Sequence, residues 1–224
     1  MLLTIAGLLN EAQLAKIHAS LAGASFVDGR LTAGRAAGRV KHNEELQPDP
    51  QVHQRINRVV MSALGHNADF KSAALPHRMA DFIVARYHPG MTYGDHVDDP
   101  IMGAGGPRFR TDVSMTLFLN PPETYDGGEL VIRTPFGDRE VKLPAGDAVV
   151  YPSASVHRVA PVTRGERLVL LTWIQSYVRD AAQRELLFEL NGAREMLLAS
   201  DPDADTTKHV DRSYANLLRM WAEL

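Results

Sequence analysis

Two histidines and one aspartate are the residues of this sequence best suited to bind a metal ion. His96 and Asp98 stand two residues apart, and His157 follows His96 after sixty-one residues. In a β-strand, side chains two apart lie on the same face, so one imidazole and one carboxylate would leave the backbone together. A second imidazole from a distant strand would complete a face of three ligands. Two histidines and one carboxylate, with the other positions open, suit non-haem Fe(II) and O2 chemistry.

An arginine stands a short distance along the chain from the second histidine and could contribute to the same site. Arg167 stands ten residues after His157 and begins an apolar run that ends near Ile174 and has the length and composition of a strand. A guanidinium there could reach the far end of an acid that the metal holds at two positions. Two alternatives stay open: His157 could be a structural histidine inside a barrel, and Arg167 could pair with a core carboxylate such as Asp147.

The composition indicates an ordinary folded protein. The 224 residues suit one domain, or one domain with a helical appendage, and a net charge of -3 indicates neither nucleic acid nor an anionic membrane as a partner. The absence of cysteine excludes disulfides, cysteine-zinc sites and cysteine nucleophiles. The apolar start of the chain lacks the basic region of a signal peptide, and no apolar run is long enough to span a membrane, so we expect a cytoplasmic protein.

The elements that would position these residues can be predicted from periodicity and turn residues. Helices are predicted at Asn10–Leu21 and Pro50–Gly65, and a strand at Met79–His88, before the first two ligands. Six short strands follow: 111–119, 128–133, 140–143, 148–151, 155–159 and 167–177. Short strands at this rhythm predict an antiparallel sandwich or barrel.

The pattern changes to helices after Tyr177. Helices are predicted at 180–190, 193–199 and about 206–223, with Asp180 and Thr206 or Thr207 as caps, so the chain divides into residues 1–178 and 179–224. These helices could simply cover the barrel. They could also form a homo-oligomer contact through either of two apolar sets: Leu186, Leu187, Leu190 and Leu197, or Leu217, Leu218 and Trp221.

The segment 28–46 is rich in glycine and basic residues and is predicted to be a loop. It is either a solvated loop or a mobile basic rim over a pocket. A basic rim would favour an acidic substrate.

Several of these motifs together resemble the PKHD-type hydroxylases. The resemblance extends over essentially the whole chain and rests on Arg86-Tyr87-His88-Pro89-Gly90-Met91, His96-Val97-Asp98, Tyr125-Asp126-Gly127-Gly128-Glu129-Leu130, Leu143-Pro144-Ala145-Gly146-Asp147, His157-Arg158-Val159 and Arg184-Glu185-Leu186-Leu187-Phe188. It implies an α+β, mainly β fold: a double-stranded β-helix (jelly roll) with N-terminal flanking helices and the family's own C-terminal helical segment. The family is related to prolyl hydroxylases, and its PiuC-like members are often found near bacterial iron-uptake genes.

The resemblance also implies roles for individual residues. His96, Asp98 and His157 would be the Fe(II) ligands, Arg167 would anchor 2-oxoglutarate, and Tyr87 would reach its carboxylate. No catalytic residue is expected beyond the metal ligands.

Other residues match pocket positions in relatives. These are Tyr93 and Trp173, and also Phe118, where some relatives have a tyrosine. Because Phe118 cannot donate a hydrogen bond, a second donor to the carboxylate would have to be Tyr87, Ser114 or Thr116, or be absent.

The activity implied is that of an Fe(II)- and 2-oxoglutarate-dependent dioxygenase. It would use O2, with ascorbate as a reductant, and would hydroxylate an unidentified peptide or small molecule while 2-oxoglutarate becomes succinate and CO2. Asp98 predicts hydroxylation, since halogenating relatives lack this carboxylate. Two other functions use similar ligands: a zinc hydrolase, and a non-catalytic jelly-roll sensor that binds metal or 2-oxoglutarate. The spacing of Arg167 and the lack of a glutamate beside the ligands disfavour the hydrolase.

Overall fold

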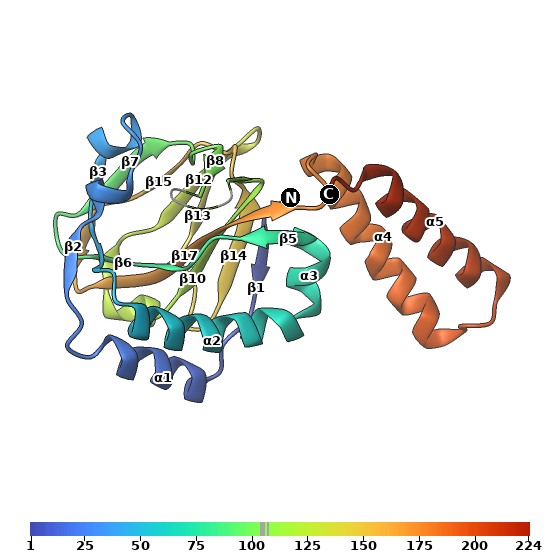
Figure 1. Ribbon diagram of the computed structural model, residues 1–224, viewed down its shortest axis with the longest axis horizontal. Coiled ribbons are helices and arrows are strands. Elements are labelled where there is room, and N and C mark those ends of the chain that lie inside the picture. The colour runs from blue at the N-terminus through green and yellow to red at the C-terminus, as the bar shows by residue number, and fades with distance from the viewer. Residues whose placement is uncertain (104–105, 107) are drawn as a thin grey trace.

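The centre of the molecule is a barrel of two β-sheets, seen in a computed structural model that describes residues 1–103, 106 and 108–224 (Figure 1). The larger sheet has the order β1 (Leu3–Ile5), β14 (Ala148–Pro152), β10 (Val113–Phe118), β17 (Arg167–Ser176), β6 (Ile83–Tyr87), β4 (Glu44–Leu46) and β2 (Phe26–Asp28), and β5 (Pro76–Met79) also pairs with β17. The smaller sheet has the order β13 (Gly137–Val141), β12 (Leu130–Thr134), β15 (His157–Val159), β7 (Thr92–His96) and β3 (Lys41–His42). The pairs within both sheets are antiparallel, so the predicted jelly roll is confirmed.

Two further strand pairs lie outside these sheets. They are β8 (Ile101–Met102) with β9 (Phe109–Arg110), and β11 (Asp126–Gly127) with β16 (Val162–Arg164).

Strand β17 separates two apolar cores because its side chains alternate between the faces of the larger sheet. Leu168, Leu170 and Ile174 belong to the core outside the barrel, whereas Val169 belongs to the core inside it. Arg167 shares the inner face with Val169. The run is apolar on both faces because both faces are buried.

Three N-terminal helices cover the outer face of the larger sheet: α1 (Glu11–Leu21), α2 (Pro50–His66) and α3 (Ala68–Ala74) (Figure 1). The two predicted helices are confirmed. Asn10 and Gln13 form a capping box at α1, and Asp49 caps α2 ahead of Pro50. Helix α3 was not predicted, because seven residues are too few for a clear period.

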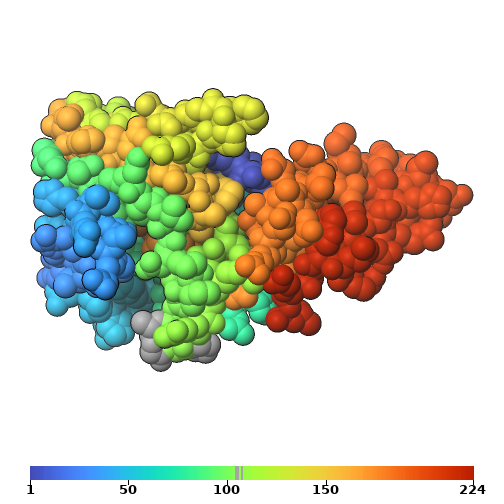
Figure 2. Space-filling model, turned by 90° about the horizontal axis from the view of Figure 1, so that it is seen from above, coloured from blue at the N-terminus to red at the C-terminus, as the bar shows by residue number. Residues whose placement is uncertain are grey.

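The C-terminal helices α4 (Ala181–Ser200) and α5 (Asp205–Trp221) form a hairpin that projects from one side of the barrel (Figures 1 and 2). Asp180 caps α4 as predicted, with Oδ1 2.9 Å from the Ala182 and Gln183 nitrogens. The predicted break between 190 and 193 is wrong, since α4 continues through Gly192. The predicted threonine cap of α5 is also wrong: Ala204 occupies that position.

The hairpin joins the barrel through a small apolar cluster. Its buried members are Leu75, Val178 and Leu187, with Tyr214, Leu217, Leu218 and Trp221 packed against them. All three members of the second predicted contact set therefore pack within the chain, whereas Leu186 of the first set is exposed. The division at residue 178 and the oligomer contact stay predictions. Among the described helices, none has the length and apolar character needed to cross a membrane.

Two segments differ from prediction. The strand predicted at 79–88 is confirmed only over β6 (83–87), because residues 80–82 belong to no strand and Met79 ends the separate strand β5. The segment 28–46 is not simply a loop. It contains two short 3-10 turns and the strands β3 and β4, which pair with β7 and β6 and so join the two sheets.

Candidate active site

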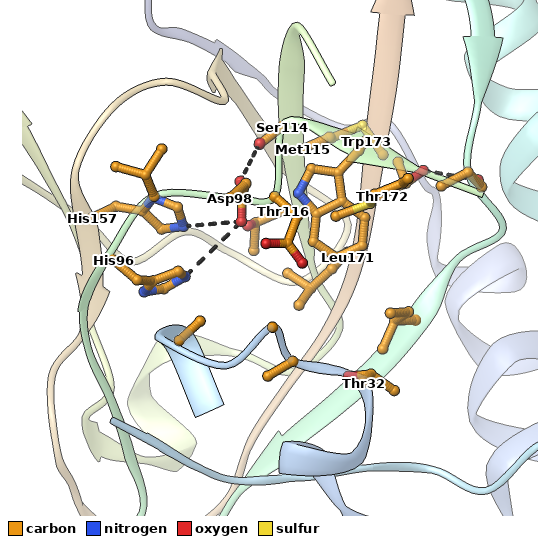
Figure 3. A pocket seen from close by; sticks show the side chains of 18 of the residues that line it. Thr32, His96, Asp98, Ser114, Met115, Thr116, His157, Leu171, Thr172 and Trp173 are labelled. Carbon is orange, nitrogen blue, oxygen red and sulfur yellow. Dashed lines mark hydrogen bonds and ion pairs between the residues drawn. The ribbon is translucent and has the colours of Figure 1, made fainter. Parts of the chain in front are cut away.

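His96, Asp98 and His157 lie together at one end of the smaller sheet (Figure 3). His96 ends β7 and is the cross-strand partner of His157, which begins β15. The Asp98 Oδ1 atom is 4.0 Å from His96 Nε2 and 3.8 Å from His157 Nε2. One nitrogen or oxygen from each residue lies within 4.8 Å of the others, so the group could hold a metal ion.

Backbone carbonyls orient both imidazoles. His96 Nδ1 lies 2.8 Å from the Gly94 oxygen, and His157 Nδ1 lies 3.0 Å from the Ser155 oxygen. A carbonyl only accepts, so each Nδ1 carries the hydrogen and each Nε2 keeps its lone pair. Burial and the nearby His157 lower the pKa of His96 to about 4, which keeps it in the neutral form that binds metals.

Aromatic rings enclose the two histidines. The Tyr93 ring stacks on His96 with centroids 3.6 Å apart and planes 13° apart, and the Tyr151 ring meets His157 edge-on at 5.2 Å. Tyr93 was predicted to line the pocket. Tyr151 was missed, although its inward direction follows from alternation along β14.

Arg167 is a buried cation with no acidic partner among the residues that the structure describes. Its side chain is 1% exposed, and none of its three guanidinium nitrogens has a hydrogen-bond partner among the described residues. The guanidinium carbon lies 5.0 Å from the Tyr87 ring centroid and 5.5 Å from that of Phe118. Asp147, the alternative partner, instead accepts a hydrogen bond from the Gly7 nitrogen at 2.7 Å. A buried, unpaired charge is costly, so Arg167 calls for an anionic ligand.

One cavity of about 1050 Å³ contains both groups. Its lining includes Tyr87, His96, Asp98, Thr116, His157 and Arg167, and also the apolar side chains of Met79, Ile83, Ile101, Met102, Phe109 and Trp173. An acid bound to Arg167 would therefore share one space with a metal ion bound by the histidines.

The other residues predicted for the pocket differ in their position relative to the cavity. Tyr87, Tyr93, Ser114 and Trp173 line this cavity, while Phe118 supports Arg167. The Ser114 hydroxyl lies 2.5 Å from Asp98 Oδ2, which draws its hydrogen away from any cofactor.

Two further acidic residues, Asp112 and Glu129, have partners outside the group of His96, Asp98 and His157. Asp112 bonds to Arg110 and the Ser176 nitrogen, and Glu129 faces Lys142. Neither orients a histidine.

A buried polar cluster in the cavity wall was not predicted. Lys41 and Glu45 form an ion pair there, and Thr32 bonds to both. The segment 28–46 lines the cavity as predicted, through Thr32, Ala33, Gly34, Ala37, Lys41 and Glu45. Arg30, Arg35 and Arg39 are not among the described lining residues, and Lys41 is paired with Glu45, so the basic character of the predicted rim is not seen. Lys41 and Glu45 are four residues apart, but burial of both could not be read from the sequence.

Two family models match successive parts of the chain. A family model described as the 2OG-Fe(II) oxygenase superfamily matches residues 82–175, and one described as the PKHD-type hydroxylase C-terminal domain matches residues 181–223. A PKHD-type hydroxylase of Thioalkalivibrio sulfidiphilus is 53% identical over 224 residues, which is 100% of both chains.

Solved structures share the fold. A Trichoplax adhaerens prolyl hydroxylase in complex with a hypoxia inducible factor peptide fragment has a TM-score of 0.58 and 17% identity, over 83% of this chain and 86% of that chain. HygX from Streptomyces hygroscopicus, with nickel, 2-oxoglutarate and hygromycin B bound, has a TM-score of 0.51 and 14% identity, over 79% and 84%.

Proposed function

The chain belongs to the PKHD-type hydroxylases of the 2OG-Fe(II) oxygenase superfamily, and on this premise we propose that it hydroxylates a peptide or small molecule at a site built from His96, Asp98, His157 and Arg167. As a member of this family it is a dioxygenase that uses Fe(II), 2-oxoglutarate and O2. Membership favours this activity over a zinc hydrolase or a non-catalytic sensor.

The observation that carries the proposal is the Arg167 guanidinium, which has no hydrogen-bond partner in the described part of the chain and lies in the cavity of the three side chains that could hold a metal ion. Its planar fork matches a carboxylate and would form a bidentate, charge-assisted pair with the distal end of 2-oxoglutarate. The nitrogen and carboxylate donors fit Fe(II). Tyr87 is the cross-strand partner of Arg167 and lines the same cavity, and we propose that its hydroxyl reaches the same acid.

Bound Fe(II), 2-oxoglutarate and O2 supply the oxidation, in which O2 is divided between the new substrate hydroxyl and the succinate that remains after CO2 is lost. The protein's own residues position the reactants and exclude water from them. The backbone carbonyls of Gly94 and Ser155 orient the two imidazoles through hydrogen bonds to Nδ1. The stacked Tyr93 ring shields one face of His96.

The part of the cavity lined by apolar side chains such as Met79, Ile83 and Trp173 would hold the substrate. The Trp173 indole nitrogen is buried in its wall and has no acceptor among the described residues, which favours a substrate carrying a carbonyl or similar oxygen. Proteins with the same fold bind a peptide in one case and hygromycin B in another, so both substrate classes belong to the proposal. A link to iron uptake and a role for ascorbate rest only on the family resemblance.

Anaerobic titration of 2-oxoglutarate into the Fe(II)-loaded protein tests the proposed site. We expect the charge-transfer absorption of a chelated keto acid, no band in His157→Ala, and at least about tenfold weaker 2-oxoglutarate binding in Arg167→Ala. Matched controls are the exposed residues His42→Ala and Arg212→Ala, which should leave the band unchanged. A wild-type protein that binds Fe(II) but gives no band would contradict the proposal.

A further inference from the structure

Two buried serines form a hydrogen-bonded chain that ends on Asp98 (Figure 3 draws the Ser114 contact). The Ser114 oxygen lies 2.5 Å from Asp98 Oδ2, and the Ser153 oxygen lies 2.8 Å from that of Ser114. Both serines are 2% exposed, so this chain does not depend on water at the surface.

The hydrogens in this chain have one consistent direction. A hydroxyl carries a single hydrogen, and an ionised carboxylate can only accept. Ser114 therefore donates to Asp98, and Ser153 must donate to Ser114. The bond to Asp98 is charge-assisted and the stronger of the two.

Asp98 needs such support because no ladder of strand hydrogen bonds holds it. Strand β7 ends at His96, and residues 97–99 belong to no helix or strand. The backbone at both serines is held by hydrogen bonds to neighbouring segments. Ser114 lies within β10, paired with Tyr151 and Trp173, and the Ser153 nitrogen bonds to the Asp112 oxygen at 3.1 Å.

The two carboxylate oxygens of Asp98 therefore have different surroundings. Oδ2 is occupied by Ser114, whereas Oδ1 faces both imidazoles, 4.0 Å from His96 Nε2 and 3.8 Å from His157 Nε2. We propose that Ser114, supported by Ser153, is a positioning residue that limits Asp98 to one metal-binding oxygen. A carboxylate can bind a metal through one oxygen or through both, and a second oxygen would take a position that 2-oxoglutarate needs.

This proposal rests on the proposed function, and its test separates metal binding from 2-oxoglutarate binding. The variants are Ser114→Ala, Ser114→Thr, Ser153→Ala and the double alanine variant. Ser176→Ala is the control, because Ser176 is also buried and hydrogen-bonded, but to Leu75 and Val178. Each protein is titrated with Co(II) alone, followed by its visible absorption, and then with 2-oxoglutarate on the Fe(II) form without O2.

We expect Ser114→Ala to bind Co(II) as tightly as wild type, with an altered Co(II) spectrum, and to bind 2-oxoglutarate about tenfold more weakly. Ser114→Thr keeps the hydroxyl and should restore both properties. Ser153→Ala should show a smaller loss. The double variant should match Ser114→Ala, because Ser153 acts only through Ser114.

Two results would overturn the proposal. One is a Ser114→Ala protein with the wild-type Co(II) spectrum and 2-oxoglutarate affinity. The other is a Ser114→Ala protein that loses Co(II) affinity, since Ser114 would then be needed to hold the ligand at all. A wild-type protein that shows no 2-oxoglutarate band fails the proposed function itself, which distinguishes that failure from failure of the serine proposal.

Discussion

Lys41 and Glu45 form an ion pair inside the cavity wall, with Nζ 2.5 Å from Oε1, and the Thr32 hydroxyl lies 2.6 Å from Oε2. Lys41 belongs to β3, which pairs with the strand of His96, and Glu45 belongs to β4, which pairs with the strand of Tyr87. The ion pair therefore connects the proposed metal-binding sheet with the proposed acid-binding sheet.

Removing one partner of this pair should destabilise the protein more than replacing both. Lys41→Ala or Glu45→Ala leaves an unpaired buried charge, so we expect the free energy of unfolding to fall by about 3–5 kcal/mol in urea denaturation. The double variant Lys41→Met with Glu45→Leu should lose less than either single variant. The control is Asp126→Ala, which breaks an exposed pair with Arg164 and should cost less than about 1 kcal/mol. A double variant as unstable as the sum of the singles would contradict this expectation.

Arg167→Met should stabilise the protein in the absence of ligands. The variant removes a buried cation that has no partner among the described residues and keeps much of its apolar stem. We expect a gain of about 1–3 kcal/mol in the free energy of unfolding. Glutarate, a diacid without the keto group, should raise the melting temperature of wild type and of Arg212→Met but not that of Arg167→Met. A less stable Arg167→Met protein would mean that the guanidinium has an unseen partner.

Gly128→Ala should disturb Arg167 as well as the backbone. A Cβ atom at Gly128 would lie 3.0 Å from Arg167 Cδ and 3.2 Å from Tyr125 Cε2, and the residue has φ +69°. Gly23→Ala is the control, because φ is +76° there and nothing lies within 4 Å. Both variants should lose about 1 kcal/mol from backbone strain. Only Gly128→Ala should also weaken 2-oxoglutarate binding, and equal binding in both variants would contradict this account.

Stability should decrease at high pH because of Tyr87. Burial raises the pKa of Tyr87 from 10.0 to about 12. Above pH 10 the unfolded chain loses this proton before the folded chain does, so the contribution is complete below pH 10 and is lost as pH rises towards 12. Two pKa units correspond to about 3 kcal/mol. Urea midpoints measured from pH 9 to 12 should fall less steeply in Tyr87→Phe, and parallel curves for the two proteins would refute the assignment.

Self-association through the C-terminal hairpin can be tested by substituting one charged residue at an exposed apolar position. Leu186 in α4 is 57% exposed, and Met196 and Met220 are exposed at 75% and 73%. We expect the wild type to self-associate in light scattering at micromolar concentration and Leu186→Glu to shift it towards monomer. Leu31→Glu, at a residue 76% exposed outside the hairpin, is the control and should change nothing. A wild type that stays monomeric would rule out this contact.

Local patterns in the residue order were enough for much of the fold and for the candidate ligands. His96 and Asp98 could be proposed as a ligand pair from their spacing, although the strand in fact ends at His96 and Asp98 belongs to no strand. Asn10 and Asp180 could be recognised as helix caps because each acts on nitrogens within three residues. The cap predictions hold because their interactions span only a few residues, and helix geometry decides them.

Other features depend on residues far apart in the chain. Three features arise from strand register and sheet packing. Arg167 has no hydrogen-bond partner within residues 1–103, 106 and 108–224, two serines form a chain to Asp98, and Lys41 and Glu45 are buried together. A threonine cap was predicted for α5 and a break for α4 because residue propensity was weighed without tertiary contacts. Helix α4 packs against α5 and continues through Gly192, which is itself exposed. The residues able to do chemistry were thus visible in the sequence, whereas the partners that orient them were decided by tertiary structure, because those contacts join segments that only folding brings together.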